Sequence, residues 1–246
     1  MTGQMIHIGC SGWNYRHWRG LFYPEGLPAT RWYGHYAEIF DTVELNTSFY
    51  HLPKPETFDK WRLQAAPAFR YAVKAPRFIT HMKKLGDCDE PLAEFLARAR
   101  RLGPALGPIL YQLPPRWKLN LERLEAFIAD LPADLDHVFE FREPSWIAEE
   151  VLALLGARGI GFCVHDMAGS ITPRWASGRL AYLRFHGGEG KYWGRYPDER
   201  LLGWADWIVE QAREGREVWC YFNNDIHGHA IDDALTLRAM VKQALR

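Results

Sequence analysis

The alternation of short apolar runs with helical segments constrains the fold of this 246-residue chain more than any other feature. Segments with a helical pattern separate most of these runs, and strands that alternate with helices form parallel βαβ units. The sixth connection, Met167–Arg179, is short and rich in Gly, Ser and Pro, so we expect no full helix there. The predicted strands are Ile6–Cys10, Thr42–Asn46, Arg70–Lys74, Ile109–Gln112, His137–Arg142, Gly161–His165, Leu180–His186 and Val218–Asn223. The predicted helices are Thr30–Phe40, Pro55–Ala66, Pro91–Leu102, Leu121–Leu131, Ser145–Ala157, Arg200–Arg213 and Ile231–Leu245.

Eight such units predict a closed, parallel (β/α)8 barrel of the TIM type, in a single domain over residues 1–246. The length agrees with the roughly 250 residues of a typical barrel. Asn120 can cap the helix that follows it, Pro144-Ser145 opens the next one, and Gly159 ends it. An open doubly wound sheet is the alternative, but it usually carries a glycine-rich phosphate turn after its first strand. Gly9-Cys10-Ser11-Gly12-Trp13 is not such a turn.

Composition limits the setting and the partners. Lys plus Arg and Asp plus Glu both number 30, and this balance argues against a protein that coats nucleic acid through a general basic excess. The four cysteines show no metal-ligand spacing, and most lie in apolar runs, as reduced thiols do. Met1–His7 lacks a signal-peptide pattern, and no apolar run approaches the ~18 residues of a membrane span. We therefore expect a cytoplasmic protein without membrane association.

Side chains alternate across each predicted strand, and one parity becomes polar near the C-terminal ends. In a barrel, the inward residues at those ends line the mouth where active sites lie. An ion-pair network that only stabilises the barrel is the competing interpretation. Because burying charges is costly unless they are paired, we favour a ligand pocket. The inward polar residues are Glu44, Asn46, Lys74, Gln112, Glu140, Arg142, Arg184, His186 and Asn223.

The composition of this set favours a small polar, anionic ligand, such as a phosphorylated, sugar or nucleotide-like compound. Three cations face two carboxylates, and Arg suits carboxylates and phosphates. Glu44, Glu140 and His186 are the candidate acid–base catalysts of a hydrolase or lyase. The alternative is that each Glu pairs with a neighbouring cation, which would weaken an acid role. The predicted substrate-binding residues are Trp13, Asn46, Tyr50, Lys74, His81, Gln112, Arg142, Arg184 and Asn223.

Other functions stay open. A non-catalytic nucleic-acid-binding or regulatory protein on the same barrel is the alternative to an enzyme, although the zero net charge counts against it. Lys74 could form a Schiff base, but that chemistry needs a depressed pKa, so we favour phosphate or carboxylate binding. We predict no cofactor. The alternative is a divalent metal held by His165-Asp166 together with Glu140 and His186.

Short motifs spread nearly end to end resemble the domain of unknown function 72 family, also called YecE-like proteins. This resemblance implies an eight-stranded barrel and no settled activity. The fold is similar in outline to endonuclease IV and to sugar isomerases, which use metals at the barrel mouth, but their His/Asp/Glu spacing is absent from this sequence. The motifs are Gly9-Cys10-Ser11-Gly12-Trp13-Asn14-Tyr15, Phe22-Tyr23-Pro24, Val43-Glu44-Leu45-Asn46-Thr47-Ser48-Phe49-Tyr50, Lys74-Ala75-Pro76, Ile79-Thr80-His81, Gln112-Leu113-Pro114-Pro115, Glu140-Phe141-Arg142, Ser145-Trp146, Arg184-Phe185-His186-Gly187 and Phe222-Asn223-Asn224-Asp225.

Overall fold

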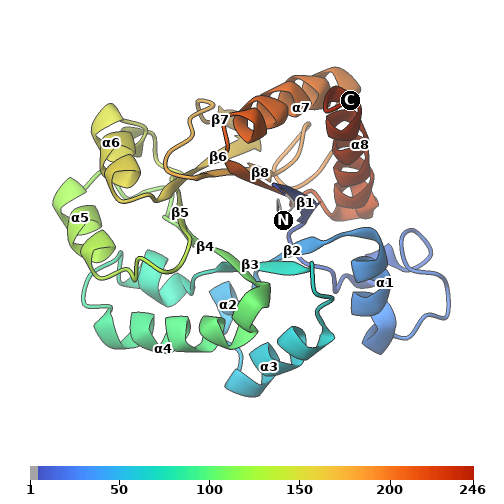
Figure 1. Cartoon of the computed structure of the whole chain (residues 1–246), viewed down its shortest axis with the longest axis horizontal. Helices are drawn as coiled ribbons and strands as arrows, with labels where there is room; N and C mark the ends of the chain where they lie inside the picture. The colour runs from blue at the N-terminus through green and yellow to red at the C-terminus, as the bar shows by residue number, and fades with distance from the viewer. Residues whose placement is uncertain (1–4) are drawn as a thin grey trace.

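Eight parallel strands form a closed ring at the centre of the computed structural model, which describes residues 5–246 (Figure 1). The last strand pairs with the first, and the ring closes through the parallel pairing of β5 with β6. The predicted (β/α)8 barrel is therefore confirmed. Its strands are β1 (Ile6–Cys10), β2 (Thr42–Leu45), β3 (Arg70–Lys74), β4 (Leu106–Gln112), β5 (His137–Glu140), β6 (Gly161–Met167), β8 (Leu180–Phe185) and β9 (Glu217–Phe222). Residues 1–4, part of the segment tested for a signal peptide, lie outside the described residues.

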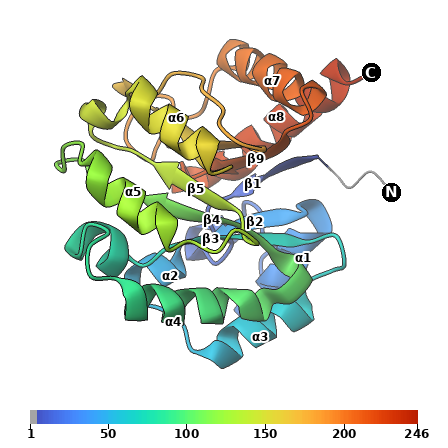
Figure 2. The ribbon, with the colours of Figure 1, turned by 60° about the vertical axis from the view of Figure 1, so that its left-hand side comes forward.

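Helices surround the outside of the ring (Figures 1 and 2). Between β6 and β8 the chain forms only the short strand β7 (Ser170–Ile171), antiparallel to β6, so the prediction of no full helix there is confirmed. One helical turn, α2 (Thr47–Tyr50), was not predicted. The other helices are α1 (Trp32–Ile39), α3 (Pro55–Gln64), α4 (Asp89–Ala99), α5 (Leu121–Ala129), α6 (Glu149–Ala157), α7 (Asp198–Arg213) and α8 (His229–Ala244). Within residues 5–246, none of these is long and apolar enough to cross a bilayer.

Local signals explain several boundaries. The Asn120 side chain accepts a hydrogen bond from the Arg123 amide at 2.9 Å, which is the predicted cap of α5. Gly159, which follows α6, has a φ of +66°, a conformation that glycine adopts without strain. The helix predicted from Ser145 begins only at Glu149, because an extended residue, Ala148, separates it from a single 3-10 turn at Pro144–Trp146.

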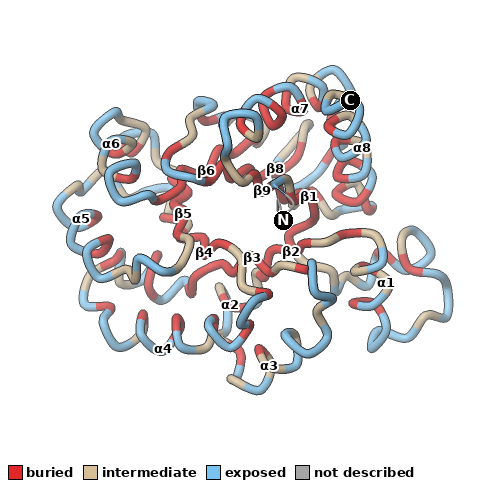
Figure 3. The backbone as a smooth tube through the Cα atoms, viewed as in Figure 1, coloured by how far each residue is buried: buried red, intermediate tan, exposed pale blue. Residues whose placement is uncertain are grey.

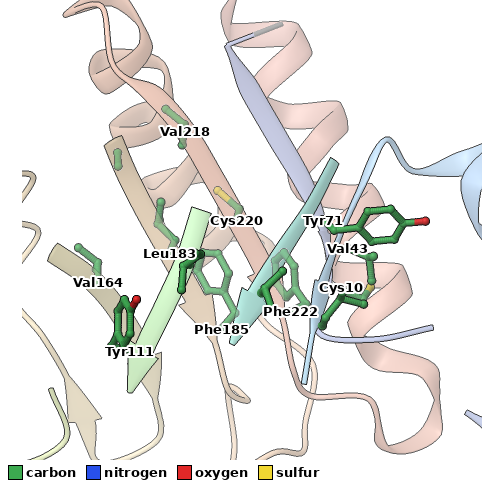
Figure 4. Close-up of a cluster of buried hydrophobic side chains, with 14 of the residues drawn as sticks. Cys10, Val43, Tyr71, Tyr111, Val164, Leu183, Phe185, Val218, Cys220 and Phe222 are labelled. Carbon is green, nitrogen blue, oxygen red and sulfur yellow. The ribbon is translucent and has the colours of Figure 1, made fainter. Parts of the chain in front are cut away.

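The outward faces of the strands pack under the helices and form the main core. Figure 4 shows members of this layer, such as Val43, Leu183, Phe185 and Phe222, and Figure 3 shows buried backbone concentrated in the strands. A second cluster fills the inside of the barrel: Ala72, Leu110, Val138, Cys163, Leu180, Tyr182, Trp219 and Tyr221. These two layers confirm the strand parity read from the sequence. They also give the polar side chains above the inner cluster an apolar floor.

Candidate active site at the C-terminal end of the barrel

Arg184 connects two carboxylates from separate strands. Its Nη2 lies 2.8 Å from Oε1 of Glu44 on β2, and its Nη1 lies 2.6 Å from Oε2 of Glu140 on β5. All three side chains are at most 1% exposed. Strand parity explains the meeting, because each residue is an inward position near the C-terminal end of its strand. Both glutamates therefore pair with an arginine, which is the alternative to an acid role that the sequence left open.

Hydrogen-bond donors surround the carboxylate of Glu44. Ser11 Oγ and Tyr182 OH each donate to it at 2.8 Å, in addition to the Arg184 bond. All three contacts come from donors, so in this arrangement Glu44 anchors Arg184. Neither Ser11 nor Tyr182 was predicted in the site, although Tyr182 shares the inward parity of Arg184.

Glu140, Arg142 and His186 form the second half of the network. Arg142 Nη2 lies 2.5 Å from Glu140 Oε1 and 2.6 Å from His186 Nε2, and the latter is 3.4 Å from the same carboxylate oxygen. An arginine N–H can only donate, so Nε2 of His186 accepts from Arg142 and the proton of the neutral ring lies on Nδ1. Asn223 Nδ2 lies 3.3 Å from this Nδ1. The contact with Arg142 therefore sets the tautomer of the imidazole.

The electrostatic environment gives Glu140 and His186 different charge states. Burial alone would raise the pKa of Glu140, but Arg142 and Arg184 outweigh it and hold that pKa well below its usual range. Burial, together with the same two arginines, lowers the pKa of His186 well below 6.5. At neutral pH the carboxylate is charged and the imidazole is neutral. Glu140 therefore has no proton to donate as a general acid at neutral pH.

Lys74 is buried at the end of β3. Its Nζ donates to Gln112 Oε1 at 2.6 Å and lies 4.0 Å from the ring centre of Phe49. No Asp or Glu oxygen of residues 5–246 forms an ion pair with it within 4.0 Å. Burial, reinforced by the positive charge of Arg184, lowers the pKa of Lys74 to about 7. The depressed amine pKa that Schiff-base chemistry needs is thus present in the structure.

The remaining predicted residues lie at the margin of this network. Asn46 Nδ2 is 3.5 Å from the Ser11 carbonyl, and His81 packs edge-on against Phe49. Trp13 packs edge-on against Tyr33 and Trp61 instead of joining the charged groups.

Tyr50 is 75% exposed. Together with Phe49 and Phe78 it lines a cavity of about 520 Å³ beside the mouth. A larger cavity, about 710 Å³, lies at the opposite end of the barrel around Phe40 and Leu245, and it contains none of the converging polar groups.

Asp166 does not lie with the other residues of the predicted metal site. Its carboxylate accepts from Trp204 Nε1 at 2.9 Å and pairs with Arg200 of α7, outside the barrel. The reason is strand parity: Asp166 follows the inward His165, so its side chain lies on the other face of β6. Among residues 5–246, no three His, Cys, Asp or Glu side chains are grouped as metal ligands.

His165 makes stability depend on pH. Its side chain is 2% exposed, its Nε2 lies 3.0 Å from Ser170 Oγ, and burial lowers its pKa to about 4, with Glu140 opposing only in part. Stability carried by a base with a lowered pKa is complete above the unfolded pKa of ~6.5 and is lost as the pH falls toward 4. Between pH 7 and 5, wild type should lose about 2 kcal/mol more than His165→Gln in urea unfolding. Parallel pH profiles would contradict this.

Comparison with known proteins agrees with the fold. The model of the family described as "Protein of unknown function DUF72" matches residues 7–246. The chain is 36% identical to UPF0759 protein YecE of Escherichia coli (strain K12) over 59% of its own length and 51% of that protein, so the match spans about half of that relative. It is 27% identical to UPF0759 protein YunF of Bacillus subtilis (strain 168), over 93% of this chain and 92% of that protein.

Solved structures give the same result. A crystal structure of a DUF72 family protein from Thermotoga maritima MSB8 superposes with a TM-score of 0.87 and 30% identity, over 97% of this chain and 100% of that one. A DUF72 family protein from Enterococcus faecalis V583, at 19% identity and a TM-score of 0.83, covers 97% of this chain and 96% of its own and shares the fold. The family model, the relatives and the barrel agree, and the chain belongs to the DUF72 family.

Proposed function

We propose that this protein is an enzyme that acts on a small polar substrate with an anionic group, by acid–base chemistry at the C-terminal mouth of the barrel. One observation supports this most: the network holds three basic side chains and only two carboxylates. Arg184 is balanced by two carboxylates, Arg142 shares only Glu140, and Lys74 contacts a neutral amide. Burying a cation without enough negative charge around it costs free energy, and an anionic ligand would offset this cost.

The anion-binding groups would be Lys74, Gln112 and Arg142. Gln112 is half-buried and the Arg142 side chain is 7% exposed, whereas Glu44, Glu140 and Arg184 below them are fully enclosed. Nε of Arg142 is buried and has no hydrogen-bond partner among the described residues, so a ligand that entered beside it would supply the missing acceptor. An arginine edge that binds a carboxylate or phosphate makes strong, directional hydrogen bonds.

His186 would accept a proton from the substrate. It is neutral, and Glu140, 3.4 Å from Nε2, would stabilise the imidazolium that forms once a bound anion draws Arg142 away from that nitrogen. A positioned base of this kind contributes typically ~10²–10⁴-fold to a rate. Hydrolases and lyases both use such a step, and Glu44 would support it by fixing Arg184.

Binding to a panel of anions tests the first half of the proposal. The panel contains inorganic phosphate, phosphorylated sugars, nucleoside monophosphates and small carboxylates, and binding is measured by thermal shift and calorimetry. Arg142→Met should weaken binding of the best anion by about tenfold or more, as expected for loss of a charge-assisted hydrogen bond. Glu140 keeps Arg184 as a partner in this variant, so the barrel should still fold. Arg100→Met, which removes a surface ion pair with Asp134, is the control and should bind normally.

Anions that bind are then assayed for turnover. His186→Ala should lower kcat by about 10²–10⁴-fold with little change in Kd, because the base acts on the reaction step. Binding that is equal in wild type and Arg142→Met, or turnover that survives His186→Ala, would contradict the proposal.

A further inference from the structure

Lys74 differs from the other cations of the mouth in what it touches. Arg142 and Arg184 each contact a glutamate, whereas the Lys74 ammonium contacts an amide oxygen and an aromatic ring. A lysine that serves only as a structural charge is normally paired with a carboxylate when it is buried. The surroundings of Lys74 therefore disfavour the charged form of its amine.

The groups that face Lys74 come from several strands. Glu44 and Glu140 favour its charged form, and Arg142 and Arg184 oppose it. Both carboxylates are already bound by Arg184, so their effect on Lys74 is reduced. The net result of burial and these charges is a pKa of about 7, at which a large share of the amine is neutral at physiological pH.

We infer that the Lys74 amine attacks the carbonyl carbon of an anionic aldehyde or ketone and forms an imine with it. This inference rests on the proposed function, whose anion-binding groups, Gln112 and Arg142, would hold the charged end of the substrate beside the amine. It narrows the substrate class to small carbonyl compounds that carry a carboxylate or a phosphate.

The step needs only a proton from solvent. The nitrogen lone pair forms a C–N bond, and one amine hydrogen moves to the carbonyl oxygen, which becomes a hydroxyl. This hydroxyl takes up one proton from solvent and leaves as water, so the nitrogen keeps its second hydrogen and the product is a protonated imine. Nothing is oxidised or reduced. The protonated imine then withdraws electrons from the neighbouring carbon, which is the effect that amine catalysis supplies in proton-transfer and C–C cleavage reactions. His186 would be the base for the proton that this activation releases.

Phe49 and Gln112 define the approach to the amine. The Phe49 ring covers one side of Nζ, and Gln112 fixes the direction of one N–H bond. Both side chains are half-buried, so they border solvent, whereas Lys74 itself is 7% exposed. A small aldehyde reaches the nitrogen by displacing the Gln112 contact, and bulk water has little access to hydrolyse the imine.

Reductive trapping with glyoxylate, a small anionic aldehyde, tests the inference. Full-length protein is incubated with glyoxylate at pH 7, reduced with sodium borohydride, and mapped by peptide mass spectrometry. Lys74 should be labelled at least about tenfold faster than the exposed Lys54, Lys60 and Lys118, which serve as internal controls. Glycolate, which has the same charge and no carbonyl, should slow the labelling by competition. Lys74→Arg should lose this label, whereas Lys118→Arg, at an exposed lysine, should keep it.

The outcomes separate the inference from the proposed function. Labelling spread over the exposed lysines, with Lys74 unmodified, overturns the inference. If the anion panel still binds through Arg142 in that case, the proposed function stands. If neither binding nor trapping occurs, both fail.

Discussion

Arg184→Met should lower the free energy of unfolding by about 3–5 kcal/mol. The variant leaves Glu44 and Glu140 buried, each without one of its hydrogen-bonding cations. Removing one partner of a buried ion pair costs this much because the remaining charge is uncompensated. For a domain of this size, the melting temperature should fall by roughly 6–20 °C. Urea unfolding and thermal melts measure both quantities.

Two further variants make this result interpretable. Arg100→Met removes an exposed ion pair with Asp134, and it should leave the melting temperature nearly unchanged. The double variant Arg184→Met with Glu44→Gln removes one orphaned charge and should recover part of the lost stability. If Arg184→Met melts like Arg100→Met, Arg184 does not hold the two carboxylates as described.

Lys74→Met should have the opposite effect and stabilise the protein by about 2–4 kcal/mol at pH 7. The folded-state pKa of about 7 lies below the ~10.4 of an unfolded lysine, so the folded state disfavours the charged amine. The gain from the substitution should be small above pH ~10.4, grow as the pH falls to about 7, and stay constant below that. The same variant should lose anion binding, a trade of stability for function found at many active sites.

Lys118→Met is the matched control, because Lys118 is exposed. It should change neither stability nor binding. A lower melting temperature for Lys74→Met would mean that Lys74 is a structural cation with stabilising partners, contrary to the contacts described.

The sequence predicted the strands and their inward faces because both follow from local patterns. Parity placed Glu44, Lys74, Glu140 and Arg184 inside the barrel, and the structure has them there. The same rule, applied to His165 and Asp166, would have separated these two neighbours and excluded the proposed joint metal site. Strand ends were less predictable, and β5 stops at Glu140, so Arg142 lies just beyond it.

Side-chain contacts between strands could not be predicted from the sequence. Whether Arg184 meets Glu44, Glu140 or both depends on the tilt and stagger of the closed sheet, which no local pattern encodes. The positions of the aromatic loop residues were also not predictable from local patterns. Trp13 packs against Trp61 and Tyr50 faces solvent, because loop geometry, not strand parity, sets their direction.

Titration of the lysine side chains by NMR tests the central claim most directly. Carbon-13 signals of the lysine ε-methylene groups report each amine, and comparison with Lys74→Met assigns the signal of interest. One signal should titrate near pH 7, belong to Lys74, and shift to a higher pH when a binding anion is added, because the anion favours the charged amine. If the Lys74 signal titrates near the ordinary ~10.4 and ignores anions, the barrel mouth is not the anion-binding, amine-bearing site described here.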